Sequence, residues 1–214
     1  MTNPLISRFS KPILIAILAI VAASIGALLA RTYMQSTTPV VLNTGTVLEP
    51  PKGVQPFLLV DQDGTPFTEA NLHAHWTLAF FGFTNCGDIC PVTLTTLAAV
   101  AKDLGDLPKG NQPQIVFVTV DSQRDTTAVI KGYLKGFNPE FVGVTGKQES
   151  LEALTKDLGV PSAIRPLENG GYAVDHYGGI LLFNPEGKMR ALFSAPHTVA
   201  GLASDYRLLV ETSR

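Results

Sequence analysis

The chain is predicted to be a three-layer α/β domain with a mixed central sheet, preceded by one transmembrane helix. Two patterns support this prediction: an uncharged apolar stretch near the amino terminus, and an alternation of strand-like and helix-like segments over the remainder. Alternation that ends in a hairpin and a helix favours helices on both faces of a mixed sheet. The net charge of −2 over 214 residues gives no sign of nucleic-acid binding.

The first element is the uncharged stretch, which runs from Pro12 to Ala30. At about 1.5 Å per residue, a helix of this length just spans a hydrocarbon core of about 30 Å. A cleaved signal peptide is the alternative, but its apolar region is usually only about 7–15 residues long, and no small-x-small cleavage pattern follows Ala30. We therefore expect a retained anchor over residues 12–31, after a cytoplasmic tail over residues 1–11.

Charges around the anchor indicate its orientation. Arg8 and Lys11 precede it, and Arg31 alone follows it directly. This asymmetry favours a cytoplasmic amino terminus and a carboxy-terminal domain on the outer side. No long presequence rich in Arg and Ser precedes the anchor. This favours the bacterial inner membrane, crossed once with the domain in the periplasm, over the mitochondrial intermembrane space.

The segment after the anchor, residues 32–53, is rich in Thr, Pro, Val and Gly and shows no helical period, so we expect an extended tether. Residues 54–214 then form one domain. Its first element is a hairpin that turns at Asp63 and Gly64, a favoured turn pair. The strand 76–83 follows and is almost continuously apolar, as buried parallel strands are.

Apolar periodicity and turn residues predict the remaining elements of the domain. Gly159 predicts the end of a helix, because glycine favours the C-cap, and the turn Asn184–Gly187 precedes a returning strand. In chain order we expect a helix from Pro91, a strand from Gln114 that ends at Asp121, a helix over Thr126–Phe137, a short strand over Phe141–Val144, a helix over Ser150–Leu158, a strand over Ile180–Phe183 and a helix over Val199–Val210.

The chain contains only two cysteines, Cys86 and Cys90, between the strand 76–83 and the helix expected from Pro91. Proline suits the first position of a helix, so Cys90 is expected at the helix cap. There the positive end of the helix dipole favours thiolate over thiol, and thiolate is the form that binds metals or attacks disulfides. Two thiols in one loop indicate redox chemistry, a soft metal or both, and outside the cytoplasm a disulfide is the default.

Three segments of the sequence resemble the Sco/SenC family. They are Phe81–Pro91 with its Cys-x-x-x-Cys-Pro pattern, Val118–Thr126 with Val-Thr-Val-Asp and Arg-Asp-Thr, and Val174–Gly187 with Val-Asp-His before Ile-Leu-Leu-Phe-Asn-Pro-Glu-Gly. The resemblance implies a thioredoxin-like fold and a membrane-anchored protein that helps copper reach cytochrome c oxidase. Two positions depart from the family pattern: Gly87 stands where proline is most frequent, and Asn85 where histidine is frequent. A glycine gives the loop more freedom.

The resemblance also implies a site, because the family's copper ligands match Cys86, Cys90 and His176. The chemistry of these residues points in the same direction. Soft thiolates select Cu(I) or zinc, and imidazole suits both metals. Structural zinc normally takes four protein ligands, one more than these three residues supply, so Cu(I) is favoured over zinc.

A working disulfide between the two cysteines is the alternative. Dithiol oxidoreductases typically carry Cys-x-x-Cys and a proline before the facing strand, where this chain has Gly178 and Gly179.

The function that the resemblance implies is that of a copper carrier, for which no turnover chemistry is required. Such a carrier would hold Cu(I), with Cu(II) as a further state, and pass it by ligand exchange to the copper-bearing subunit of cytochrome c oxidase. Other periplasmic copper or thiol proteins are further candidate partners. The alternative is a thiol–disulfide oxidoreductase that reduces the acceptor's cysteines. A peroxidase-like activity is a third alternative, but no arginine lies near Cys86 in the sequence.

Asp88, Asp175 and Tyr177 are candidates for a supporting role around the site. Asp88 lies between the cysteines, and its alternative role is to cap the following helix through its side chain. Asp175 and Tyr177 flank His176, where either can orient the imidazole ring. The histidines not assigned to the site are His73, His75 and His197. Alternation at the mouth of a strand directs the first two toward solvent. Residues expected to form a turn and cap are Asp121, Arg124 and Asp125.

Overall fold

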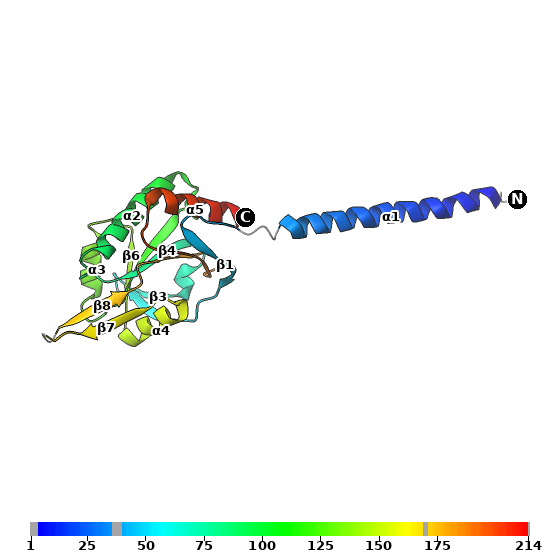
Figure 1. Cartoon of the computed structure of the whole chain (residues 1–214). Helices are drawn as coiled ribbons and strands as arrows, with labels where there is room; N and C mark the ends of the chain where they lie inside the picture. Colours follow the sequence, from blue (N-terminus) through cyan, green and yellow to red (C-terminus); the bar gives the residue numbers. More distant parts are fainter. Residues whose placement is uncertain (1–3, 36–39, 169–170, 214) are drawn as a thin grey trace. The chain divides into compact units, whose positions relative to one another are not determined.

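The computed structural model describes residues 4–35, 40–168 and 171–213. These residues belong to two compact units, Met1–Val40 and Val41–Arg214, and each unit is described by itself. The second unit holds the β-sheets, both cysteines and all the described α-helices except the first (Figure 1).

The first unit contains the helix α1, Pro4–Gln35. Its segment Ile13–Arg31 has a mean hydropathy of 2.9, and none of it is buried within the protein. By length and composition, this is the one helix among the described residues that is able to cross a membrane. The apolar helix therefore exists where the sequence predicts an anchor, over residues 12–31.

An eight-stranded sheet forms the centre of the second unit, in the order β1-β10-β9-β4-β5-β6-β2-β3. Strands β4, β5 and β6 are parallel, and the other neighbouring pairs are antiparallel. The sheet is therefore mixed, as predicted. Its strands are β1 Gly45–Lys52, β2 Leu58–Asp61, β3 Pro66–Thr68, β4 Trp76–Gly82, β5 Pro113–Thr119, β6 Val142–Thr145, β9 Ile180–Phe183 and β10 Met189–Phe193.

Helices cover both faces of this sheet and complete three layers. Leucines of α4 pack in one core cluster with Ala79 and Phe81 of β4. Successive strand residues point to opposite faces, so Trp76 points the other way, where its ring meets Tyr206 of α5 in an edge contact at 6.1 Å. Figure 1 shows α2 and α5 side by side. The helices are α2 Ile89–Asp103, α3 Thr127–Leu134, α4 Gln148–Leu158 and α5 Val199–Thr212, with short 3-10 turns at Glu69–Leu72, Leu104–Asp106 and Lys109–Asn111.

Most elements agree with the sequence prediction to within a few residues, but the start of α2 differs. The hairpin β2–β3 turns at Gly64, and α4 ends at Gly159, both with positive φ (81° and 74°) as the turn and the cap require. The helix α2 begins at Ile89, with Asp88 as its N-cap, and not at Pro91. Proline fits this third helical position as well, because the first four N–H groups of a helix have no intrahelical acceptor.

The predicted tether contains a strand that the sequence analysis does not anticipate. Residues Gly45–Lys52 form β1, which pairs antiparallel with β10 at the edge of the sheet. Prolines at positions 50 and 51 hide its strand character, and an edge strand tolerates them. The second unit thus begins at Val41 rather than at residue 54. Residues 36–39 of the expected tether lie outside the described part of the chain.

A second unanticipated element is a hairpin separate from the main sheet. Its strands β7, Ser162–Pro166, and β8, Tyr172–His176, pair antiparallel and form a two-stranded sheet of their own. None of their residues is fully buried. The hairpin therefore lacks the apolar alternation that reveals strands in a sequence. Its last residue is His176.

Candidate metal centre

The two cysteines lie in the loop and first turn that follow β4. Both are free thiols; Cys86 is partly exposed and Cys90 is buried. A Cβ atom at Gly82, the last residue of β4, would lie 2.7 Å from Cys90 Sγ. The sulfur therefore occupies space that any other residue at position 82 would fill.

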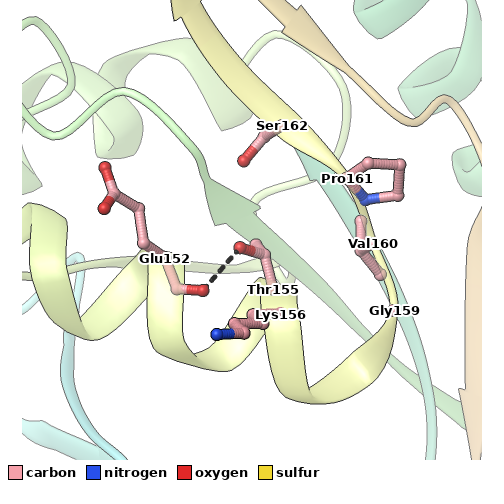
Figure 2. A pocket seen from close by; sticks show the side chains of 7 residues that line it. All are labelled: Glu152, Thr155, Lys156, Gly159, Val160, Pro161 and Ser162. Atoms are coloured by element: carbon pink, nitrogen blue, oxygen red, sulfur yellow. Dashed lines mark hydrogen bonds between the residues drawn. The ribbon is translucent and has the colours of Figure 1, made fainter.

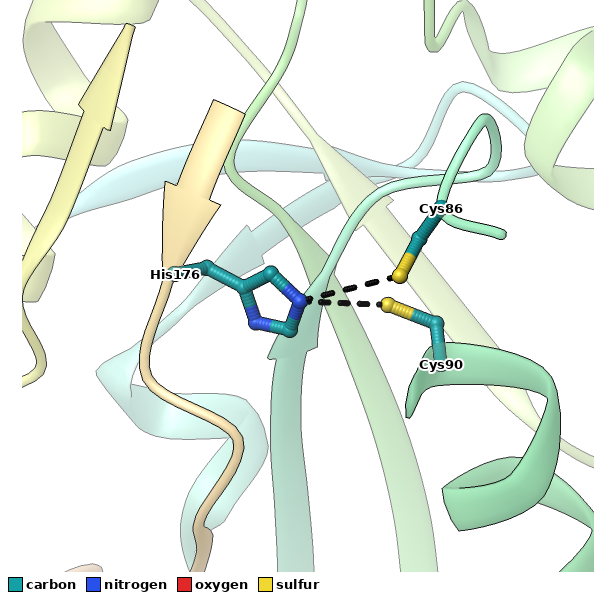
Figure 3. Close-up of side chains that lie close together, drawn as sticks. All are labelled: Cys86, Cys90 and His176. Carbon is teal, nitrogen blue, oxygen red and sulfur yellow. Dashed lines mark hydrogen bonds between the residues drawn. The ribbon is translucent and has the colours of Figure 1, made fainter. Parts of the chain in front are cut away.

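His176 brings the third donor to the same place from the end of β8 (Figure 3). Its Nε2 lies 3.4 Å from Cys90 Sγ and 3.9 Å from Cys86 Sγ. All three donor atoms are within 4.8 Å of one another. Two aromatic rings pack against the imidazole in T-shaped contacts, with centroids at 5.5 Å for Phe83 and 6.0 Å for Phe80. The structure thus brings together the three residues that the sequence selects.

The hydrogen bond of the His176 ring favours the neutral tautomer that can bind a metal through Nε2. Its Nδ1 lies 3.3 Å from the carbonyl oxygen of Tyr177, which can only accept a hydrogen bond. A neutral ring that donates Nδ1–H there presents the lone pair of Nε2 to the two sulfurs. Burial lowers the pKa of His176 and keeps the ring neutral. The nitrogen is therefore available without loss of a proton.

The protonation of Cys90 differs from the sequence prediction. Burial raises the pKa of the Cys90 thiol well above its ordinary range, and the neighbouring Cys86 adds to this, while a backbone hydrogen bond from Phe83 acts in the opposite direction. The expected thiolate at the start of a helix is therefore wrong for the metal-free protein. Burial outweighs the helix dipole here, and Cys90 must release its proton when a cation binds.

Two sulfurs and one imidazole nitrogen form a soft donor set. Such a set suits Cu(I) and zinc better than hard cations, which prefer oxygen ligands. Among the described residues, no fourth His, Cys, Asp or Glu joins this cluster. A structural zinc site normally has four protein ligands, so the donor set fits a three-coordinate Cu(I) ion better.

The candidate supporting residues have other contacts. Asp175 forms an ion pair with Arg165 on the exposed side of the hairpin, and no hydrogen bond joins its carboxylate to the His176 ring. The backbone carbonyl of Tyr177 holds that ring, while the Tyr177 hydroxyl lies 3.1 Å from Ser194 Oγ. Asp88 is exposed at the N-cap of α2, but its side chain makes no capping hydrogen bond.

The remaining histidines lie outside the cluster, as predicted. His73 and His75 are exposed beside the start of β4. His197 has a partner that the sequence does not reveal, because its Nε2 lies 2.8 Å from the carbonyl oxygen of Gly178. None of the three offers a donor to the cluster of two sulfurs and one nitrogen.

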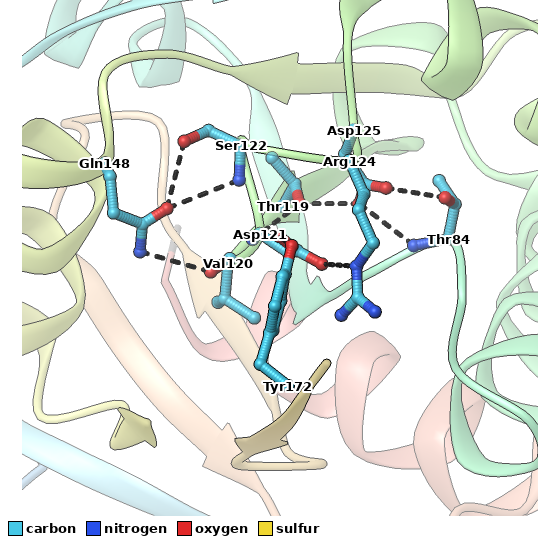
Figure 4. A network of polar contacts seen from close by, with 9 residues as sticks. All are labelled: Thr84, Thr119, Val120, Asp121, Ser122, Arg124, Asp125, Gln148 and Tyr172. Carbon is cyan, nitrogen blue, oxygen red and sulfur yellow. Dashed lines mark hydrogen bonds and ion pairs between the residues drawn. The ribbon is translucent and has the colours of Figure 1, made fainter. Parts of the chain in front are cut away.

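A buried polar network connects the cysteine loop to the hairpin that carries His176 (Figure 4). Asp121 is fully buried and accepts hydrogen bonds from Arg124 Nε and, at 2.8 Å, from the Tyr172 hydroxyl of β8. The Arg124 guanidinium lies over the Tyr172 ring, 4.1 Å from its centroid, and 5.7 Å from the centroid of Phe83. The Asp121 carboxylate and the Arg124 guanidinium therefore connect the cysteine loop to the hairpin that carries His176.

The second carboxylate of this network, Asp125, is also fully buried and holds the cysteine loop. It accepts hydrogen bonds from the backbone N–H of Thr84 at 2.9 Å, from Thr84 Oγ1 at 2.5 Å and from Thr119 Oγ1 at 2.6 Å. The sequence predicts a turn and cap for these residues, and a turn bond from Asp125 N to Asp121 O is present. It does not predict that the turn fastens the cysteine loop.

A cavity near the hairpin does not contain the donor cluster. It has a volume of about 620 Å³ between the end of α4 and the start of β7, and Figure 2 shows Glu152, Thr155, Lys156 and Ser162 around it. No cysteine or histidine lines it. A second, largely apolar groove of about 450 Å³ lies beside Asp88. The soft donor set, and not a cavity, identifies the candidate site.

Comparisons with known proteins agree with this geometry. The family model described as SCO1/SenC matches residues 46–211. A protein of Stutzerimonas stutzeri is 40% identical over 146 residues, which are 67% of this chain and 70% of that protein. The mitochondrial SCO1 homolog 1 of Arabidopsis thaliana is 35% identical over 147 residues, 69% of this chain and 44% of that protein. The match thus spans about half of the mitochondrial relative.

Solved structures show the same fold. Arabidopsis thaliana ScoI with copper bound has a TM-score of 0.68 and 34% identity, covering 75% of this chain and 98% of that chain. Yeast Sco1 with copper bound has a TM-score of 0.69 and 32% identity, covering 75% of this chain and 90% of that chain. The second unit therefore has the thioredoxin-like fold of these proteins.

Proposed function

Because the chain belongs to the SCO1/SenC family, we propose that it is a membrane-anchored copper metallochaperone that delivers copper to the copper site of cytochrome c oxidase. Its copper ligands are Cys86, Cys90 and His176. The observation that supports this proposal most directly is the convergence of the three donor atoms within 4.8 Å. Relatives of similar sequence and fold hold copper in their solved structures, which supports copper binding by this chain.

The exposure of the ligands suits transfer by ligand exchange. Cys90 is fully buried, whereas Cys86 is partly exposed at the mouth of the site. An incoming ligand of the acceptor reaches the metal from the side of Cys86, so this sulfur is displaced first and the buried sulfur last. The neutral ring of His176 keeps the nitrogen in place without a change of charge. Copper, as Cu(I) with Cu(II) as a further state, is the cargo in this scheme.

The anchor and the acceptor belong to the same proposal. The apolar segment Ile13–Arg31 is long enough to span a bilayer, and we place the tail 1–11 in the cytoplasm and the copper-binding domain in the bacterial periplasm. A domain held at the outer surface of the inner membrane meets the extracytoplasmic copper-bearing subunit of the oxidase by diffusion in the membrane. Other periplasmic copper or thiol proteins are further partners in this scheme.

Copper titration of the reduced full-length chain in detergent tests the ligand set. The wild type is expected to bind one Cu(I), and each of Cys86→Ser, Cys90→Ser and His176→Ala should raise the dissociation constant by about tenfold or more, since each removes one of three ligands. His197→Ala is the matched control, because His197 lies outside the cluster. Stoichiometric binding that is undiminished in all three ligand variants would contradict the proposal.

Thiol–disulfide exchange is the second candidate function, and the two free sulfurs in the same cluster favour it. In this alternative the pair reduces the acceptor's cysteines, so that copper can enter, and is itself oxidised to a disulfide. His176 is not needed for that reaction. Exchange activity that survives His176→Ala in a protein that binds no copper would favour the oxidoreductase over the copper carrier.

A further inference from the structure

The apolar groove beside Asp88 exposes side chains that the fold itself does not cover. It lies between the first two turns of α2 and the loop that leads into α5. Its largest aliphatic side chains are Ile89 and Val92, which are 51% and 66% exposed. Pro196 and His197 line it from the loop before α5. Exposed apolar side chains that share one groove, rather than lying scattered over the surface, are typical of an interaction site.

The groove adjoins both parts of the candidate metal centre. Ile89 directly precedes the candidate ligand Cys90. A Cβ atom at Gly178, two residues after His176, would lie 3.5 Å from Ile89 Cγ2. His197 Nε2 lies 2.8 Å from the carbonyl oxygen of the same glycine. A protein that fills the groove therefore lies next to the loop of the two sulfurs and next to the loop that follows the nitrogen ligand.

One charge accompanies the apolar side chains. Among the described residues, Asp88 is the only Asp, Glu, Lys or Arg that lines the groove. It is exposed, and in the described part of the chain its carboxylate forms no capping hydrogen bond and no ion pair. It follows Cys86, the partly exposed sulfur, by two residues. A basic side chain that pairs with Asp88 would therefore bring its protein close to this sulfur.

We propose that this groove docks the protein that accepts the metal, with an apolar side chain of the acceptor against Ile89 and Val92 and a Lys or Arg opposite Asp88. The inference rests on the proposed function and names the surface that holds the acceptor. Ligand exchange requires a ligand of the acceptor to reach Cys86, beside which the groove lies. The acceptor must also leave after each transfer, and a small apolar contact with one charge pair at its rim suits such a transient complex.

Transfer of Cu(I) from the loaded full-length chain in detergent tests the inference, with the reduced, metal-free soluble copper domain of the oxidase subunit as acceptor. Val92→Ser should raise the acceptor concentration that gives the half-maximal rate about tenfold, because it removes an apolar contact. The limiting rate at saturating acceptor should stay the same. Removal of Cu(I) by a small chelator should proceed at the wild-type rate, since a chelator needs no docking surface.

Val129→Ser is the matched control for the apolar contact. Val129 is likewise an exposed valine of a helix, 43% exposed on α3, but it lies outside the groove. Its replacement should change neither the half-maximal acceptor concentration nor the limiting rate. An equal effect of the two serine substitutions would overturn the inference.

Asp88→Asn tests the charge pair, because it removes the charge and keeps a good N-cap residue. Transfer to the acceptor should slow about threefold at low salt, and its rate should depend less on the salt concentration than in the wild type. Glu140→Gln, which neutralises an exposed acid outside the groove, should change neither. An unaltered salt dependence in Asp88→Asn would overturn the pairing with a basic side chain.

The outcomes separate this inference from the proposed function. A Val92→Ser protein that transfers copper like the wild type overturns the inference and leaves the proposed function standing. A loss of Cu(I) affinity in this variant does the same, because the groove then acts on the site itself. A wild type that sediments as a dimer and becomes monomeric in Val92→Ser also overturns it, since a second copy then fills the groove. A wild type that binds no copper, or passes none to this acceptor, overturns both proposals.

Discussion

Gly82 is a residue at which the central sheet comes close to the candidate metal centre. A Cβ atom at this position would lie 2.7 Å from Cys90 Sγ, 3.0 Å from the Phe80 ring and 3.1 Å from the Phe117 ring. Contacts below 3.0 Å are not observed for real Cβ atoms. The buried sulfur therefore has its position only because residue 82 has no side chain.

Gly82→Ala is expected to destabilise the fold by about 1–3 kcal/mol, as other added methyl groups in packed cores do. It should also weaken Cu(I) binding by about tenfold, because the sulfur of Cys90 must move away from the other two donors. Urea unfolding and competition with a Cu(I) chelator measure the two effects.

The control for this prediction is Gly87→Ala in the cysteine loop. A Cβ at Gly87 has no neighbour within 4 Å, so the same added methyl group should change stability by less than about 0.5 kcal/mol. Copper affinity should stay at the wild-type value. Equal effects of the two alanine substitutions on stability and copper affinity would show that the close contact at Gly82 does not determine the position of Cys90.

At the residue scale, the three donors that meet in one cluster were predictable, and their protonation was not. Cys86 and Cys90 stand out as the only thiols, and the Val-Asp-His pattern singles out His176. The pKa of Cys90 depends on burial, and the space at Gly82 that its sulfur occupies is bordered by Phe80 of β4 and by Phe117 of the neighbouring strand β5. The local sequence predicts that Cys90 lies at the start of a helix, but it does not predict how deeply the sulfur is buried.

Among the elements, the hairpin β7–β8 has the most direct influence on the site, because His176 is its last residue. Tyr172, its first residue on β8, is fastened to Asp121 and lies under Arg124. The same Arg124 also lies near Phe83, which contacts the His176 ring. This contact at Tyr172 therefore fixes the hairpin relative to the cysteine loop.

Tyr172→Phe is expected to raise the Cu(I) dissociation constant about fivefold, since it removes a hydrogen bond to a buried carboxylate and loosens the element that carries the nitrogen ligand. Chelator competition measures this change, and near-ultraviolet circular dichroism checks that the core is intact. Arg165→Gln serves as control on the same hairpin. Its ion pair with Asp175 is exposed on both sides, so copper affinity should not change. A copper affinity unchanged in Tyr172→Phe would show that this contact does not position His176.

The elements that sequence patterns predicted are the ones that bury apolar side chains. Strands β4, β5 and β9 are apolar runs in the centre of the sheet, and α4 has both a periodic apolar face and a capping glycine. Strand β1 and the hairpin β7–β8 were not recognised, because they lie at an edge or outside the sheet and expose most of their residues. Strand β1 also pairs with β10, which is distant in the sequence, so no local pattern contains its partner.

At the scale of the second unit, Asp205 joins the two ends of the domain. It is fully buried on α5 and accepts four hydrogen bonds from the backbone and side chains of Asn43 and Thr44, at 2.7–3.1 Å. These residues directly precede β1. The last helix of the domain therefore fixes the point at which the chain enters the sheet.

Asp205→Asn is expected to destabilise the domain by about 2 kcal/mol at pH 7, because an amide replaces a charged acceptor of several hydrogen bonds. Burial acts to raise the pKa of Asp205, but the hydrogen bonds from Asn43 and Thr44 outweigh it and hold the pKa below its ordinary value. The stabilisation by the Asp205 carboxylate is therefore complete above about pH 4, the ordinary pKa of an Asp. It is lost as the pH falls through the lower pKa that Asp205 has in the folded protein.

Urea unfolding of both proteins at pH 7 and pH 3 measures this difference. The gap between wild type and Asp205→Asn should narrow toward pH 3, since the wild-type carboxyl then begins to bind a proton. Ser204→Ala, an exposed change next to it on α5, should leave the midpoint unchanged at both values. A gap of constant size at the two pH values would show that the charge of Asp205 is not what stabilises the domain.

The separation of the hairpin β7–β8 from the eight-stranded sheet has a kinetic consequence for the cargo. Both candidate sulfur ligands follow a strand at the centre of the main sheet, whereas the candidate nitrogen ligand ends the hairpin β7–β8, whose strands pair only with each other. Withdrawal of His176 therefore breaks no hydrogen bond of the main ladder. Once the acceptor has displaced Cys86, we expect the next step of release to require only that the hairpin lifts away, so that release can be fast even when equilibrium binding is tight.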